Sequence, residues 1–382
     1  MFEGLSIVVI ANESMNCDNA HSLGINSQEA MIGKTFADVK LQHGEEVVVH
    51  PQQMLNSILS ILDSITDLAA YMKGELVPHL SSLFDNMPMR RPSKAALSSL
   101  LLSLVPPWPT DVLQNAVHAA DGGYLLHTVL WHSPATYAEI CQCYVRYVQI
   151  HYWIAPSVVF DGFAVLPSMK SVEQKQWAAK HMSADIKIAW HIRSTVHQAD
   201  CPGNPHNKQG LIKAASESLQ AAGIDVKQAV SDSDTLTVFT AVHHAAEGQP
   251  VVVIGTDTDL MALVTRASSD STVCQINPGH SRVPWKVLRV SAIKEAIGSL
   301  ENNVLFLHAV TGSDTTSAPC QQGKKKGCRV LESNNQLKQT VTVFSTPQAN
   351  PEDIAKAGEE CLLPLYGAYT FNSLCSIQEE EC

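Results

Sequence analysis

The first part of the chain has hydrophobic residues at helical spacing and is then interrupted by prolines. Hydrophobic positions between residues 51 and 85 fall on one broad face, which predicts an amphipathic helical region. Two breaks follow, at residues 87–94 (MPMRRPSK) and 105–109 (VPPWP), because proline does not continue a helix. We therefore place a domain boundary near Pro109 and expect residues 1–110 to form an accessory N-terminal region.

After this boundary, short apolar runs alternate with amphipathic segments. The apolar runs lie at residues 116–120, 157–160, 226–230 and 251–254. Helical patterns separate them, the clearest at 207–222, where a glycine follows the last periodic residue. Short buried strands alternating with helices are typical of a parallel sheet covered on both faces. We predict an α/β domain over residues 111–300, with a parallel sheet flanked by helices, a helical segment at 301–345 and an acidic tail at 346–382.

Aspartate follows the end of nearly every predicted strand, and one further aspartate follows a helical pattern. These residues are Asp121, Asp161, Asp232, Asp234, Asp257, Asp259 and Asp314. In an open parallel sheet, ligands bind outside the carboxyl ends of the strands. Residues i and i+2 of an extended segment also point to the same side, so Asp257 and Asp259 are expected to face one pocket. We therefore expect these side chains to converge at one edge of the sheet.

Carboxylates that converge in this way favour divalent cations. Two unit charges 4 Å apart repel by ~4 kcal/mol at an effective dielectric of 20, and a bound cation relieves that repulsion. A ligand set made of oxygen atoms suits Mg²⁺ or Mn²⁺, and two such ions can hydrolyse a phosphodiester. Taken singly, each aspartate is better explained as a helix N-cap or a turn residue. Caps do not explain why nearly every strand of one domain ends in aspartate.

Composition excludes several classes of protein. With 45% hydrophobic and 16% charged residues, the chain is not a disordered, collagenous or coiled-coil protein. The net charge is −11, of which residues 351–382 contribute −6 (seven acidic residues against one lysine), leaving −5 for the rest. That balance still permits a local basic face. No apolar run reaches the ~20 residues that span a membrane, and ten unevenly spaced cysteines indicate reduced thiols. We expect an intracellular protein, nuclear or cytoplasmic.

Several motifs resemble a known family when taken together. They are DGGYLLH (121–127), VVFDG (158–162), SDSDTL (231–236), VVVIGTDTDL (251–260) and TGSDTTS (311–317). In this order they resemble the flap endonuclease and XPG group of PIN-like nucleases. The resemblance is closer still to an uncharacterised animal lineage of large PIN-like proteins, in which a stretch like PHNKQ (205–209) and a GKKK after TGSDTTSAP recur. It covers roughly residues 110–330.

The resemblance implies a PIN-like, Rossmann-like fold and a metal-dependent nuclease. All seven aspartates correspond to catalytic and metal-binding positions of the family, with two Mg²⁺ or Mn²⁺ ions and flapped or branched DNA or RNA as the substrate. At positions 232 and 234 the family has glutamate, so the aspartates here are one methylene shorter. Nucleic-acid contacts are expected from two groups of lysines, although the second group equally fits a solvated loop. These lysines are Lys170, Lys175 and Lys180, and Lys324, Lys325 and Lys326.

Two other functions remain open from the sequence. The strand followed by Asp257-x-Asp259 also has the form found in phosphohydrolases of the haloacid dehalogenase type, although that family places its nucleophilic aspartate early in the chain. A PIN-like scaffold that binds nucleic acid or protein without cutting is the third alternative. Zinc is not favoured, because the histidines and cysteines between residues 181 and 206 lack the usual ligand spacing.

Overall fold

The computed structural model describes residues 39–40, 46–47, 83, 89–109, 115–132, 134–152, 154–162, 183–268, 273–277 and 286–367. The helical region expected at 51–85 lies outside these residues, as do Lys170, Lys175 and Lys180. The chain divides into two compact units. One unit is Lys94–His308, and the other combines Met1–Ser93 with Ala309–Cys382.

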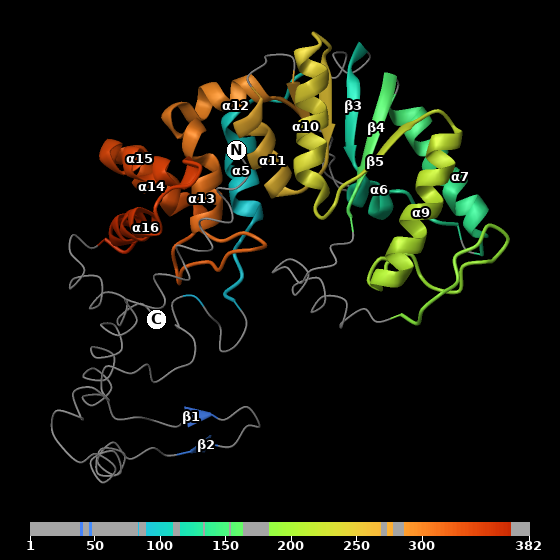
Figure 1. Cartoon of the computed structure of the whole chain (residues 1–382), viewed down its shortest axis with the longest axis horizontal. Coiled ribbons are helices and arrows are strands. Elements are labelled where there is room, and N and C mark those ends of the chain that lie inside the picture. The colour runs from blue at the N-terminus through green and yellow to red at the C-terminus, as the bar shows by residue number, and fades with distance from the viewer. Residues whose placement is uncertain are drawn as a thin grey trace. The chain divides into compact units, whose positions relative to one another are not determined.

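The unit Lys94–His308 is built on a six-stranded sheet (Figure 1). Its strands are β3 (Val117–Asp121), β4 (Ile154–Phe160), β5 (Asp225–Gln228), β6 (Val251–Ile254), β7 (Val273–Asn277) and β8 (Lys286–Arg289), in the order β5-β4-β3-β6-β7-β8. The strands are parallel except for β8, which pairs antiparallel with β7. The predicted α/β fold is confirmed, whereas the antiparallel edge formed by β7 and β8 was not predicted.

The strand order changes direction at β3. From β3 the chain adds β4 and then β5 on one side, and returns to place β6 on the other side of β3. In such sheets the ligand crevice lies at this switch point, outside the carboxyl ends of the strands. Asp121 is the last residue of β3, and Asp257 follows β6 by three residues, so both lie at this edge.

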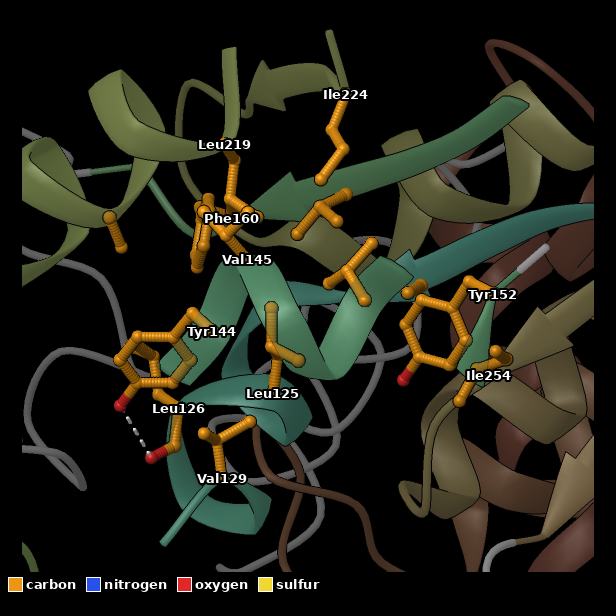
Figure 2. Packing of buried hydrophobic residues seen from close by; sticks show 14 of the residues in the cluster. Leu125, Leu126, Val129, Tyr144, Val145, Tyr152, Phe160, Leu219, Ile224 and Ile254 are labelled. Carbon is orange, nitrogen blue, oxygen red and sulfur yellow. Dashed lines mark hydrogen bonds between the residues drawn. The ribbon is translucent and has the colours of Figure 1, made fainter. Parts of the chain in front are cut away.

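One face of the sheet is covered by α6 (Gly122–Thr128), α7 (Tyr137–His151) and α9 (Pro205–Ala221). Their apolar residues form one core with the strands; Leu125 and Leu126 of α6 lie beside Tyr144 and Val145 of α7 and Phe160 of β4 (Figure 2). The Tyr144 hydroxyl is also satisfied, because it donates to the Leu126 carbonyl at 3.2 Å. This packing fixes α6, and therefore the end of β3 from which α6 starts.

The other face carries α10 (Ser233–Ala246), with α11 (Thr258–Ala267) and α12 (Val290–Ile297) (Figure 1). The helix α5 (Ala95–Leu104) buries Leu97 and Leu101 and packs against α11 and α12. It therefore belongs to the same unit as the sheet. The boundary that we predicted near Pro109 falls inside this unit, and Trp108 is itself joined to β8, where its N–H donates to the Val287 carbonyl at 2.7 Å.

A 3-10 helix η2 (Gly298–Asn303) and α13 (Val304–Val310) follow α12. The described helices of the other unit are α14 (Lys324–Ser333), α15 (Asn335–Thr340), η3 (Val341–Ser345) and α16 (Pro351–Leu365), and the two-stranded ribbon β1 (Val39–Lys40) and β2 (Glu46–Val47) also belongs to it. None of the described helices is long and apolar enough to span a bilayer. All cysteines among the described residues are free thiols.

Candidate metal centre

Asp121 ends β3 and at the same time caps α6. Its Oδ1 accepts the Gly123 N–H at 2.9 Å, and its Oδ2 accepts the Tyr124 N–H at 3.1 Å. Burial raises the pKa of this carboxyl, and the nearby Asp161 charge raises it further, while the Gly123 N–H opposes the shift. The N-cap explanation is therefore correct for Asp121, and it is compatible with a second role because an ionised carboxylate offers about four acceptor positions.

Asp161, after β4, is linked to Asp121 by a serine. The Ser233 hydroxyl lies 3.2 Å from Asp121 Oδ1 and 2.9 Å from Asp161 Oδ1, and the Ser233 N–H donates to the same Asp161 oxygen at 3.2 Å. The ammonium of Lys208, in the first turns of α9, lies 2.8 Å from Asp161 Oδ2. We call Asp121 and Asp161 the aspartate pair. The protein surrounds this pair with its own donors and one cation.

Glycine lets the loops approach closely enough to form this arrangement. A Cβ on Gly162 would lie 2.0 Å from the Ala229 carbonyl oxygen and 2.4 Å from that of Val230. Both atoms belong to the backbone and cannot swing aside. Gly162 instead donates its N–H to the Ser231 carbonyl at 2.7 Å. This contact holds the end of β4 against the loop that leads into α10, which brings Asp161 to Ser233.

Three further aspartates form a compact group. Asp234 is in the first turn of α10, while Asp257 caps α11 and Asp259 lies in its first turn. One carboxylate oxygen from each lies within 4.8 Å of the others. Asp257 Oδ1 accepts the Asp259 N–H at 3.1 Å, so capping and clustering coexist here as well. We call these residues the three-aspartate group.

A histidine contacts this group from a distant part of the sequence. His308 of α13 is only 3% exposed, and its Nε2 lies 2.5 Å from Oδ1 of Asp259. The histidine belongs to the same compact unit as the aspartates. The surroundings of the three-aspartate group are therefore not made of oxygen donors alone.

The metal roles of two further aspartates, Asp232 and Asp314, stay predictions. Asp232 occupies the N-cap position of α10 without a side-chain capping bond, and it is not a member of the three-aspartate group. Asp314 belongs to the other compact unit, and its metal role stays a prediction.

The lysines of the GKKK segment differ from one another. Lys324 is 2% exposed, and its ammonium donates to the Thr311 hydroxyl at 3.2 Å and to the Gly312 carbonyl at 2.5 Å. The expectation that Lys324 contacts a phosphate backbone is therefore wrong, since it ties α14 to the turn before Asp314. Lys325 is exposed and Lys326 half-buried on the first turn of α14, so only these two remain candidates for such a contact.

The donors present suit a hard divalent cation. Carboxylate oxygens are the ligands that Mg²⁺ and Mn²⁺ take in proteins, and crowding three carboxylates is unfavourable without positive charge nearby. Among the described residues, His243, His244 and Glu247 form another set with ligand atoms within 4.8 Å of one another. That set lies at the end of α10 away from Asp234, and its imidazoles suit transition metals rather than Mg²⁺.

Sequence reasoning missed Ser233, Lys208 and His308. Ser233 stands between two predicted aspartates at the junction of a strand and a helix, and this position could have indicated it. Lys208 lies in the PHNKQ stretch, which we had quoted only for its recurrence. His308 had no local signal, because its contact with Asp259 joins residues 49 positions apart.

No protein-family model matches the sequence, and no curated protein matches it either. Solved structures do resemble it. The catalytic core of Rad2 in complex with a DNA substrate is 14% identical, with a TM-score of 0.42, over 75% of this chain and 94% of that chain. Human GEN1 in complex with Holliday junction DNA is 14% identical, with a TM-score of 0.43, over 73% of this chain and 64% of that chain.

The T5 D15 protein, co-crystallised with metal ions, is 13% identical, with a TM-score of 0.41, over 69% of this chain and 97% of that chain. These proteins belong to the group of PIN-like nucleases that the sequence motifs resemble. At such identities and TM-scores, the likeness assigns no role to any residue of this chain.

Proposed function

We propose that this chain is a structure-selective nuclease that hydrolyses phosphodiester bonds with the help of Mg²⁺ or Mn²⁺. The observation that carries the proposal is the three-aspartate group, which lies beside the switch point of the sheet with its ligand oxygens within 4.8 Å of one another. Flapped or branched DNA or RNA is the proposed substrate class.

The aspartates of the site are proposed to bind two metal ions. Asp234, Asp257 and Asp259 would hold the first ion, and Asp121 and Asp161 would hold a second. Bound there, the ions supply Lewis acidity and lower the pKa of water for attack on phosphorus.

Before metal binds, Lys208 supplies positive charge to the aspartate pair through its contact with Asp161. Its ammonium lies 2.8 Å from Asp161 Oδ2, and a lysine side chain is flexible and carries three donors. When a second cation neutralises Asp161, the ammonium becomes available to a phosphate oxygen of the substrate. Lys208 would thus take the role that we expected of lysines 170, 175 and 180.

The direct test is incubation of the purified chain with labelled flap, hairpin and single-stranded substrates, each in DNA and in RNA. Products are expected with Mn²⁺ or Mg²⁺ and none with EDTA. Binding without products under any metal condition would support the scaffold alternative. Turnover of small phosphate monoesters through a phospho-aspartyl intermediate would support a phosphohydrolase instead.

A further inference from the structure

The contact between His308 and Asp259 has a geometry that defines its chemistry. The separation between His308 Nε2 and Asp259 Oδ1 is 2.5 Å. At that distance two lone pairs would repel, so a proton must lie between the two atoms. An ionised carboxylate has only acceptor oxygens, so beside an ionised Asp259 the histidine nitrogen is the donor of this contact. With this nitrogen protonated, Nε2 is a donor and not a metal ligand.

The rest of the surroundings makes this donor rigid. His308 is 3% exposed and lies on α13, and its neighbours Leu307 and Ala309 are also buried. The Asp257 carboxylate meanwhile accepts the Asp259 N–H at 3.1 Å. The backbone of Asp259 is thus fixed by Asp257, and one of its two carboxylate oxygens is fixed by His308.

From this geometry we propose that His308 is a positioning residue for the metal centre. By holding Oδ1 of Asp259, it fixes the orientation of a carboxylate that has an oxygen within 4.8 Å of those of Asp234 and Asp257. This inference rests on the proposed metal role of the three-aspartate group. Groups that orient metal ligands typically change metal affinity 10–100-fold when they are removed, so the effect is measurable without any assay of cleavage.

The test is a calorimetric titration of the full chain with Mn²⁺ at fixed pH. All proteins carry His243→Gln and His244→Gln, because those imidazoles could otherwise bind Mn²⁺ at a separate site. In this background, His308→Gln keeps an N–H near the position of Nε2, while His308→Asn is too short to reach Asp259. His308→Leu removes the donor altogether.

The expected result is that Asn and Leu at position 308 weaken Mn²⁺ binding by about 10–100-fold, whereas Gln stays within about threefold of the parent. Thermal unfolding without metal measures any purely structural role. Equal Mn²⁺ affinity in the parent, Gln and Asn variants overturns the inference, whatever the loss in stability. If the Leu variant does not fold, the comparison of Mn²⁺ affinity between the Gln and Asn variants is sufficient to test the inference.

Failure here is distinguishable from failure of the proposed function. A parent that binds Mn²⁺ but cuts no substrate overturns the nuclease, while the affinity difference between Gln and Asn still supports a positioning role for His308. A parent that cuts substrate but shows no dependence on residue 308 overturns only this inference. A parent that does not bind Mn²⁺ overturns both.

Discussion

The aspartate pair and the three-aspartate group lie at the same edge of one sheet but differ in what balances their charge. Asp121 and Asp161 share the Ser233 hydroxyl and accept backbone N–H groups, and the Lys208 ammonium lies 2.8 Å from Asp161. The three-aspartate group instead places three carboxylates within 4.8 Å of one another, with the neighbouring donor His308 on one member. Lys208 thus supplies positive charge to the pair, whereas the ligand oxygens of the group of three lie close enough together to share one cation.

This difference predicts two metal affinities. The three-aspartate group should take the first ion tightly, since binding there relieves the repulsion of three charges. The pair should take the second ion weakly, because that ion must compete with Lys208 for Asp161. Each prediction below tests whether the two sets of aspartates differ in this way, or measures by how much.

The largest effect is expected from Asp257→Asn. Asparagine keeps an oxygen that can accept the Asp259 N–H, so the cap of α11 survives, but one anionic ligand is lost. A bound metal contributes several kcal/mol to the transition state, so cleavage should fall by about 1000-fold or more. The midpoint temperature of thermal unfolding without metal should be unchanged or slightly higher, because one repulsive charge is gone.

Glu295→Gln is the matched control for that variant. It removes the same charge from an exposed position on α12 and should cut at the parental rate. Cleavage undiminished in Asp257→Asn would refute the metal assignment of the three-aspartate group.

Lys208→Met tests the other side of the comparison. The ion pair is mostly buried, with Lys208 22% and Asp161 19% exposed. Its loss leaves two neighbouring carboxylates without this cation and should lower the free energy of unfolding by about 1–3 kcal/mol without metal. Binding of the second ion should become several-fold tighter, since its competitor has gone. Urea unfolding and Mn²⁺ titration measure the two effects.

Lys213→Met is the control for this change, because Lys213 is exposed on the same helix. An independent reporter is His127, whose pKa is lowered first by burial and then by the charge of Lys208. In Lys208→Met that pKa should rise. If the second ion instead binds more weakly than in the parent, Lys208 does not compete with it, and the comparison is wrong.

The buried strands of the fold were predictable, and its edge was not. The strands β3, β4 and β6 lie inside a covered parallel sheet and therefore appear as short apolar runs. At the edge, β7 contains the buried but polar Gln275, and β8 is recognisable only through its pairing with β7 and Trp108. Helix α5 was assigned to the accessory region because the prolines after it look like a boundary, whereas its packing against α11 and α12 decides its place.

The site was predictable to the extent that it depends on strand ends. Asp121, Asp161 and Asp257 follow strands that the sequence reveals, and parallel pairing then brings them to one edge. Lys208 and His308 come from helices 47 and 49 residues away from their partners, and only tertiary packing determines which helical side chain meets an aspartate.

Asp121→Asn tests the charge balance of the pair through pH. Burial, with a contribution from Asp161, raises the pKa of Asp121 in the folded protein above the usual 3.8. The folded state then binds this proton more readily than the unfolded state, so stability falls as the pH rises through that window and is regained as the pH falls. The Asn variant gives up the bond from the Tyr124 N–H to Oδ2 at every pH, a cost of about 1 kcal/mol. Against that constant cost it should gain stability relative to the parent at pH 7, because a buried charge is gone.

That advantage should shrink as the pH is lowered towards 4, because the parent protonates Asp121 and the Asn variant cannot. Urea unfolding of both proteins at several pH values, without metal, gives the difference directly. An advantage that stays constant with pH would mean that the protein already compensates the charge of Asp121 fully in the folded state.

The smallest effect is expected from Ser233→Ala, and it bears most directly on whether the pair and the group of three are separate. The Ser233 hydroxyl has one hydrogen to share between Asp121 and Asp161, while its backbone N–H to Asp161 survives the change. Stability should fall by about 0.5–1.5 kcal/mol, with Ser231→Ala on the exposed loop as the control. Asp234 is the next residue along α10, but a helix turns adjacent side chains about 100° apart, so the loss of the hydroxyl should leave the first Mn²⁺ affinity unchanged. If Ser233→Ala weakens that first affinity as strongly as His308→Asn does, the five aspartates act as one site, and the distinction between the two sets does not hold.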